Sequence, residues 1–283
     1  MNILLLGKTG QVGFELHRTL SPLGTITAPG RAELDLTSKQ AVADYLKAHN
    51  PELIVNAAAY TAVDAAEKHQ QEAFRLNAGL PEQLATFAAE QGALLVHYSS
   101  DYVYPGDGDQ PWQETSATGP LSVYGASKLA GDQGIQQSGC DHFIFRTSWV
   151  YSARGNNFMK TMLRLAKSKP ALNIVADQIG APTPARLIAQ ITSMAIHNNM
   201  PSGLYHLAPS GETSWHGFAQ EIFRQSGHSV KTNPIPTSDY PTSAKRPLNS
   251  KMNTAKLEGA LNIQLPTWQS QLELTLGEYL DKS

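Results

Sequence analysis

Two side chains able to take part in proton transfer stand four residues apart in the run Ser122-Val-Tyr-Gly-Ala-Ser-Lys128. On a helix, this spacing puts Tyr124 and Lys128 on one face. A free tyrosine has a pKa near ~10, too high for ready proton exchange at neutral pH. An ammonium ~5 Å away favours the phenolate by roughly 3 kcal/mol, or about 2 pKa units, at an effective dielectric of ~20. The pair is predicted to supply a general acid for chemistry at a carbonyl, although Tyr-x-x-x-Lys alone also fits an ordinary surface helix.

A glycine-rich turn follows the first apolar run of the chain. Residues 2–6 predict a short buried strand, and Gly7-Lys-Thr-Gly10-Gln-Val-Gly13 follows at once. Glycines allow backbone to approach a pyrophosphate closely, and the N–H groups of a following helix attract the anion. A P-loop is excluded, because that motif needs glycine at position 2, where asparagine stands. The turn predicts a dinucleotide-binding fold; a tight turn that binds nothing is the alternative.

The first half of the chain alternates between apolar strands and helices. Strands are expected at 2–6, 24–28, 52–56, 93–99 and 142–147, with helices near 11–20, 38–49, 67–91 and 123–137. This alternation predicts an α/β fold, a doubly wound parallel sheet of the Rossmann type over residues 1–150. Ligands bind beyond the carboxyl ends of such strands. Polar residues stand at these ends in the runs Asn56-Ala-Ala-Ala59, Ser99-Ser-Asp101 and Thr147-Ser-Trp149.

Residues 151–283 differ in composition from the first half, with more prolines and shorter predicted helices and strands. We expect helices near 161–167, 184–197 and 215–226 and a strand at 204–207. This half is interpreted as a smaller nucleotide-sugar-binding lobe, with some segments returning to the sheet.

Composition excludes several classes of partner. The net charge of the 283 residues is −2 and no long basic or acidic run is present, which argues against nucleic acid. The apolar runs are too short for a membrane span, and no secretory leader is visible. Cys140 is the single cysteine, which fits a reducing cytoplasm. The histidines form no metal-ligand pattern.

These motifs together resemble the extended short-chain dehydrogenase/reductases and, within them, the dTDP-4-dehydrorhamnose reductase family. The likeness runs through almost the whole chain. Its more specific elements lie in the second half, in Asp177-Gln-Ile-Gly-Ala-Pro-Thr183 and Arg246-Pro-Leu-Asn-Ser250. The resemblance implies that NAD(P)H reduces the C4 keto group of dTDP-4-dehydro-L-rhamnose to give dTDP-L-rhamnose, a precursor for polysaccharide.

The resemblance also assigns roles. Tyr124 would give the proton to the C4 oxygen, Lys128 would hold the nicotinamide ribose and lower the Tyr124 pKa, and Ser100 would bond the phenol. The residues implied for the cofactor are Gly7, Gly10, Gln11, Val12, Gly13, Asp35, Leu36, Ala59, Tyr60, Thr61, Tyr98, Tyr124 and Lys128. Those implied for the substrate are Ser100, Asp101, Trp149 and Arg246.

NADPH is the expected cofactor, with NADH also accepted. NAD-specific folds commonly have an acid at the end of the second strand. Here Thr25-Ile-Thr-Ala28 ends without one, and Arg31 is the first charged residue, able to pair with a 2′-phosphate or only with a nearby acid. No metal is expected for the chemical step. Relatives with a metal-bridged dimer bind the metal through acidic residues. Glu15 is present here, but Arg186 stands where another acid is expected. A homodimer is therefore predicted, and a metal bridge between its subunits is not.

Other functions stay open at this point. A 4,6-dehydratase typically reads Thr-Asp-Glu, whereas Tyr102 follows Asp101 here. An epimerase uses the same tyrosine and lysine and would keep its cofactor tightly bound. A non-catalytic regulatory subunit related to these reductases, or a structural cofactor-binding protein, would not need Ser100, Tyr124 and Lys128 intact.

Overall fold

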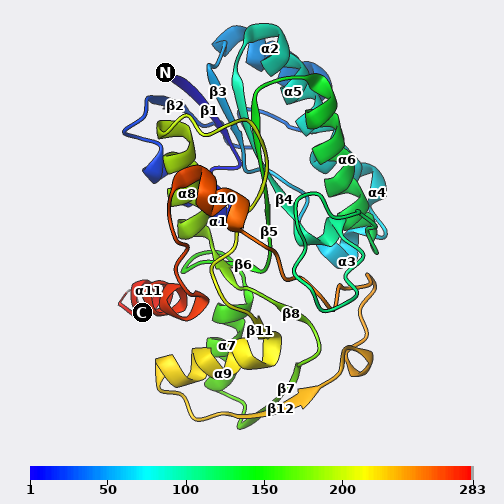
Figure 1. Cartoon of the computed structure of the whole chain (residues 1–283), viewed down its shortest axis with the longest axis vertical. Coiled ribbons are helices and arrows are strands. Elements are labelled where there is room, and N and C mark those ends of the chain that lie inside the picture. Colours follow the sequence, from blue (N-terminus) through cyan, green and yellow to red (C-terminus); the bar gives the residue numbers. More distant parts are fainter. Residues whose placement is uncertain (282–283) are drawn as a thin grey trace.

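A six-stranded parallel sheet forms the centre of the protein in this computed structural model, which describes residues 1–281 (Figure 1). The strand order is β10-β5-β4-β3-β1-β2, and each neighbouring pair is parallel. The chain direction across the sheet reverses between β1 and β3, which is where doubly wound sheets open a ligand crevice. The strands are β1 (Asn2–Leu6), β2 (Thr25–Thr27), β3 (Leu53–Asn56), β4 (Leu94–Ser100), β5 (His142–Thr147) and β10 (Gly203–His206).

Helices cover both faces of the sheet, so its strands are apolar on both sides. Alternate residues of β1 face opposite ways: Ile3 belongs to the core on one face and Leu4 to the core on the other. The first core is completed by α1 (Gln11–Thr19), α8 (Ala185–His197) and α10 (Ala255–Leu261). The second is completed by α2 (Lys39–His49), α5 (Leu80–Gln91) and α6 (Val123–Ser138).

A second body lies below the sheet in Figure 1, built mainly from the later half of the chain. Met159, Phe218 and Leu272 form part of its own apolar core. Its helices are α7 (Phe158–Ala166), α9 (Trp215–Ser226) and α11 (Trp268–Leu280). Short strands pair as β6 (Val150–Tyr151) with β9 (Thr183–Pro184), β7 (Ala171–Val175) with β12 (Lys231–Ile235), and β8 (Ile179–Gly180) with β11 (Thr213–Ser214).

The five expected strands and the helices near 11–20, 38–49 and 123–137 are confirmed within a few residues. In the second half, β10 joins the main sheet beside β5. The division into two domains near residue 150 stays a prediction. None of the described helices combines the length and apolar character needed to span a bilayer.

The helix expected near 67–91 is present but irregular. It runs as α4 (Gln70–Phe74), a π-helical turn η1 (Arg75–Gly79) and α5 without interruption, after a short α3 (Val63–Ala66). Pro81 stands in the first turn of α5 and has no N–H to donate to the preceding turn. The wider turn brings buried Asn77 against Gly131 of α6, where a β-carbon would collide with the Asn77 carbonyl.

Candidate active site

A cavity of about 1110 Å³ opens at the carboxyl ends of β1, β3, β4 and β5. Three predicted site residues, Gly13, Tyr60 and Arg246, are not among the described residues that line it. The predicted residues that do line it are Gly7, Gly10, Gln11, Val12, Arg31, Asp35, Leu36, Ala59, Thr61, Tyr98, Ser100, Asp101, Tyr124, Lys128 and Trp149.

The glycine-rich turn, residues 7–13, starts the cavity and is shaped to accept an anion. Gly7 has φ +85°, and a β-carbon there would lie 2.7 Å from the backbone of Ala57, which follows β3. Gly13 packs directly against the Gly7 carbonyl, so it supports the turn from behind. Gly10 caps α1 without a side-chain hydrogen bond, which leaves the N–H groups of the first helical turn directed at the cavity. A pyrophosphate fits this cradle.

Tyr124 lies in the first turn of α6, whose N-terminus is fixed by the Ser122 hydroxyl accepting from the Gly125 N–H at 3.2 Å. Its phenol is partly buried and lies edge-on to Tyr102, with ring centroids 5.5 Å apart. Burial raises the pKa of Tyr124 and the nearby Asp101 carboxylate raises it further, while a hydrogen bond with Ser100 lowers it.

The pKa of Tyr124 is raised in this structure, whereas the tyrosine–lysine spacing predicted a lowered one; the effect of Lys128 on it stays a prediction. Lys128 is 1% exposed and its ammonium donates to the Tyr98 carbonyl at 2.6 Å, with Nε2 of His97 at 3.3 Å. Burial is the largest cause acting on the Tyr124 phenol, and it raises the pKa of that group. Burial also lowers the pKa of Lys128 to about 8, opposed by the charge of Asp132.

Asp101 faces the same cavity from the turn after β4. It is 2% exposed, and its Oδ1 accepts from the Ser100 hydroxyl at 3.0 Å. Burial raises the pKa of Asp101 to about 6, against hydrogen bonds from Ser250 and Ser100 that lower it. An acid of this pKa can either accept or donate a hydrogen bond near neutral pH, which suits recognition of sugar hydroxyls.

Two tryptophans close the far end of the cavity. Trp149 stacks on Trp215 with centroids 3.8 Å apart, and both line the cavity. Trp149 has φ +50°, a conformation that is strained for a bulky side chain and is found mainly where function requires it. A β-carbon on Gly180 would press on the Trp149 ring at 3.1 Å. Sequence reasoning missed Trp215, whose only signal was its place at the start of an expected helix.

The loop after β2 carries the charges expected to choose between cofactors. Arg31 is exposed at the cavity, and its charge helps to lower the pKa of Asp35, whose main stabilisation comes from Thr37. Lys8 of the glycine-rich turn also lines the cavity and reaches this loop, with its ammonium 3.6 Å from Glu33. Lys8 was given no role from sequence, although it stands inside the turn.

Tyr60 and Arg246 support the cavity wall from outside. Asn77 holds the Tyr60 backbone by accepting from its N–H at 2.8 Å and donating to its carbonyl at 3.0 Å. The Arg246 guanidinium pairs with Asp64 at 2.7 Å and lies 3.4 Å from the Tyr102 hydroxyl. A role for Arg246 at a substrate diphosphate stays a prediction. Asn77 had no signal in the sequence, because its contacts depend on the π-helical turn.

The side chain of Gln11 joins the glycine-rich turn to the second body. Its Oε1 accepts from Ser152 at 3.1 Å and from Asn157 at 2.9 Å. Gly155, between these donors, packs against the Gln11 side chain and lines the cavity. The loop 152–157 is therefore held over the first turn of α1.

Arg186 joins three helices at a distance from the cavity. Its guanidinium lies 3.2 Å from Glu15 of α1 and 2.8 Å from Glu278 of α11. The Arg186 guanidinium is thus the cation that lies between these two carboxylates. Within residues 1–281, no cluster of three or more His, Cys, Asp or Glu side chains is arranged to hold a metal ion.

Comparisons with known proteins agree along the whole length. Residues 1–280 match the model of the family described as RmlD substrate binding domain. The dTDP-4-dehydrorhamnose reductase of Shigella flexneri is 49% identical over 292 residues, covering 98% of each chain. The solved reductase of that name from Clostridium acetobutylicum is 34% identical with a TM-score of 0.95, covering 99% of this chain and 100% of that one. The one from Bacillus anthracis, solved with NADP, is 36% identical with a TM-score of 0.93 over 98% and 99% of the chains.

Proposed function

The chain belongs to the dTDP-4-dehydrorhamnose reductase family, and we propose that it reduces the C4 keto group of dTDP-4-dehydro-L-rhamnose with NADPH to give dTDP-L-rhamnose. The activity supplies a rhamnose precursor for polysaccharide synthesis. NADH is expected to serve as a slower alternative.

One observation carries the proposal: a phenol, a hydroxyl and an ammonium all line one cavity of about 1110 Å³. Tyr124, Ser100 and Lys128 come from two different elements, α6 and the end of β4, and all three line the cavity that starts at the glycine-rich turn. A regulatory or purely structural protein has no need of this convergence. The same cavity extends to the tryptophan pair Trp149 and Trp215, which leaves room for a sugar nucleotide beyond the cofactor.

The cofactor fits the residues present. The first turn of α1 would hold the pyrophosphate, Asp35 and Leu36 would flank the adenine, and Lys128 would hold the nicotinamide ribose. NADPH, when bound, supplies the hydride. Arg31 and Lys8 both line the cavity, and a guanidinium or ammonium there would favour the extra negative charge of a 2′-phosphate.

The residues of the chain then supply the proton and hold the sugar. Tyr124 donates its phenolic proton to the C4 oxygen, and its raised pKa keeps that proton in place until charge develops on the oxygen. Ser100 donates to the same oxygen and steadies the phenol. Asp101 and Trp149 bind the sugar, and the paired rings exclude water from its apolar face.

The test is a cofactor-oxidation assay with enzymatically made dTDP-4-dehydro-L-rhamnose. We expect NADPH consumption to match product formation one to one, and the product to be dTDP-L-rhamnose. Oxidation with simple ketones but not with the nucleotide sugar would contradict the proposal. Sugar interconversion without net NADPH consumption would identify an epimerase instead.

Two further properties belong to this proposal. A reducing cytoplasm suits a chain whose single cysteine, Cys140, is a buried free thiol. A homodimer is proposed on the family likeness alone, and sedimentation of the purified protein tests it.

A further inference from the structure

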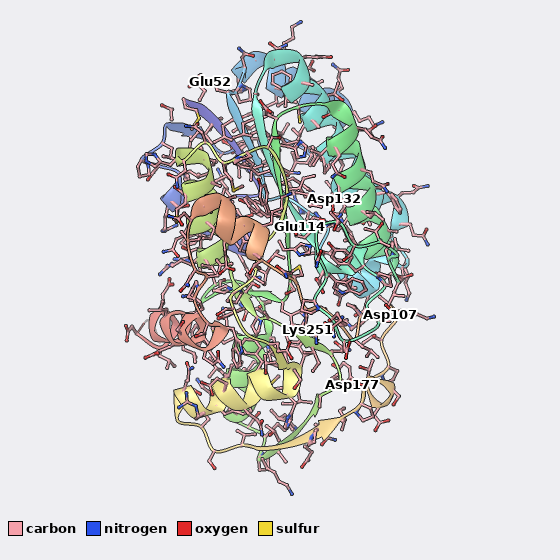
Figure 2. All side chains as sticks on the ribbon, in the orientation of Figure 1. Glu52, Asp107, Glu114, Asp132, Asp177 and Lys251 are labelled. Atoms are coloured by element: carbon pink, nitrogen blue, oxygen red, sulfur yellow. The ribbon has the colours of Figure 1, made fainter. Side chains whose placement is uncertain are left out.

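Three charged side chains lie buried together behind the cavity. Lys128, Asp132 and Arg146 are 1%, 0% and 3% exposed. Asp132 follows Lys128 by one turn on α6, on the side that faces the sheet (Figure 2). Its Oδ2 accepts from Nε of Arg146, on β5, at 2.9 Å. Buried charges are costly unless paired, so this arrangement needs an explanation.

Arg146 is anchored from the far side by a chain of neutral groups. Its Nη1 donates to the Tyr104 hydroxyl at 2.8 Å, and that hydroxyl lies 2.6 Å from Nε2 of His206. The other ring nitrogen of His206 faces the Asn253 carbonyl at 3.0 Å, and Glu114 accepts from the backbone N–H of His206 at 3.0 Å. Burial lowers the pKa of His206 to about 4, so the ring is neutral. Arg146 is thereby fixed in orientation.

The groups that face Lys128 are mostly neutral. From β4, the Tyr98 carbonyl and the His97 ring contact its ammonium. Burial holds the pKa of His97 well below its ordinary value, with the charge of Lys128 acting in the same direction. On its own helix, Tyr124 precedes it by a turn and Asp132 follows it. Asp132 is the acidic group whose charge acts on Lys128; burial raises the pKa of Asp132 itself, and the charge of Arg146 opposes that rise.

We propose that Asp132 is a positioning residue for the reduction: its carboxylate, locked by Arg146, keeps the buried Lys128 in the ammonium form. The inference rests on the proposed function, because the ammonium matters for holding the ribose and for stabilising the phenolate that Tyr124 becomes. One anion is shared between two cations, so the protonation of Lys128 depends on both neighbours.

The direction of each effect follows from charge. Burial brings the pKa of Lys128 down to about 8, and Asp132 is the group that opposes this. Removing the carboxylate leaves Lys128 and Arg146 as two unpaired buried cations, and the one that can lose a proton is Lys128. Removing Arg146 instead takes away the cation that does most to lower the pKa of Asp132, so Asp132 itself becomes easier to protonate.

The test is the pH dependence of kcat with saturating NADPH and dTDP-4-dehydro-L-rhamnose. Since Lys128 and Tyr124 must both be protonated, the rate falls as pH rises through the lower of their two pKa values. Asp132→Asn is expected to move this fall about 1–2 pH units lower, the size expected for a charge one helical turn away. Asp132→Glu is expected to restore the parent profile, because it keeps the charge.

Tyr104→Phe is the matched control. It removes the hydroxyl that joins Arg146 to His206 without changing any charge, so it is expected to lower stability and leave the pH profile in place. A profile that moves equally in Tyr104→Phe and Asp132→Asn would assign Asp132 a purely structural role and overturn the proposal. An unchanged profile in Asp132→Asn would overturn it as well.

A second variant tests the proposal if Asp132→Asn does not fold, and a direct titration of Lys128 tests it if the parent shows no activity. If Asp132→Asn does not fold, Asp132→Ser, which is smaller and also uncharged, is expected to move the fall in rate to lower pH, and a profile that stays in place would overturn the proposal. Lysine labelled with ¹³C at Cε, with the Lys128 signal assigned by its loss in Lys128→Met, gives the pKa in the NADPH complex without turnover. A parent that does not reduce the sugar would refute the proposed function, while this titration would still decide the role of Asp132.

Discussion

Tyr124 is a partly buried phenol whose proton is held more tightly than that of a free tyrosine. A Coulomb estimate from sequence predicted the reverse, because it placed the Lys128 ammonium beside the phenol in a medium of high dielectric. The structure turns that ammonium towards the Tyr98 carbonyl instead, and burial raises the pKa of the phenol. For a reductase the raised pKa is useful, since the residue must arrive protonated and give its proton only when charge develops on the substrate oxygen.

Tyr124→Phe is expected to lower kcat by a factor of ~10²–10⁴, the usual contribution of a positioned general acid. The ring and its edge contact with Tyr102 remain, so NADPH affinity, measured by fluorescence titration, should stay within a few-fold of the parent. Lys128→Met should weaken both rate and NADPH affinity, because that residue would also hold the ribose. Parent-like turnover by Tyr124→Phe would remove this residue from the acid role.

Cofactor preference is set by single residues at the rim of the cavity. The parent should favour NADPH by about tenfold in kcat/KM, because the exposed cation–phosphate contacts together contribute only ~1–2 kcal/mol. Arg31→Ala and Lys8→Ala should each reduce the NADPH/NADH ratio, with little change for NADH. Lys47→Ala, an exposed lysine of α2 that does not line the cavity, is the control and should leave the ratio unchanged. A ratio that stays constant in both variants would show that neither residue contacts the 2′-phosphate.

Among the secondary-structure elements, helix ends and helix–helix contacts set the geometry of the site. The first turn of α1 faces the pyrophosphate position, and α6 starts at a Ser122 cap that orients Tyr124 and Lys128 in its first two turns. Behind α1, Arg186 of α8 binds Glu15 of α1 and Glu278 of α11, which ties the cofactor-binding helix to the end of the chain. The position of the glycine-rich turn thus depends on an ion-pair cluster far from the chemistry.

Arg186→Met is expected to lower the free energy of unfolding by about 1–3 kcal/mol, because it leaves the buried Glu15 carboxylate without its cation. The loss is smaller than for a fully buried ion pair, because Arg186 is partly exposed to water. Urea unfolding measures the change. The double variant Glu15→Gln with Arg186→Met should recover part of the loss, since removing both charges costs less than removing one. A double variant less stable than both singles would contradict the pairing.

Much of the sheet was predictable because its signals are local. The apolar runs of β1, β3 and β5 and the spacing of Gly7, Gly10 and Gly13 determine their own structure. The irregularity within 67–91 was not foreseen, although Pro81 marked it, and the contact of Asn77 with Tyr60 follows only from the wider π-helical turn. The pairing of Trp149 with Trp215 joins residues far apart in sequence, so no local pattern could predict it.

At the scale of the whole molecule, the cavity lies where the sheet meets the second body, and residues from both line it. Gln11 bonds Ser152 and Asn157, so the loop 152–157 rests on the glycine-rich turn. Cofactor and sugar positions are therefore built by different parts of one chain.

Exhaustive chelation is expected to leave kcat unchanged at constant oligomeric state, because the cofactor and Tyr124 supply both the hydride and the proton. The assay follows NADPH oxidation before and after treatment with EDTA, with sedimentation as the control for assembly. Loss of rate without dissociation, restored by one divalent ion, would show that a metal takes part in the chemical step.

Isotope transfer tests the central claim most directly. The protein is incubated with dTDP-4-dehydro-L-rhamnose and NADPH deuterated at C4 of the nicotinamide on each face in turn, and the purified product is examined by NMR and mass spectrometry. We predict dTDP-L-rhamnose with one deuterium at C4 of the sugar from one of the two cofactor forms, in step with NADPH consumed. NADPH oxidation without deuterium at C4, or sugar conversion without NADPH oxidation, would contradict the assignment of the protein as a C4 ketoreductase.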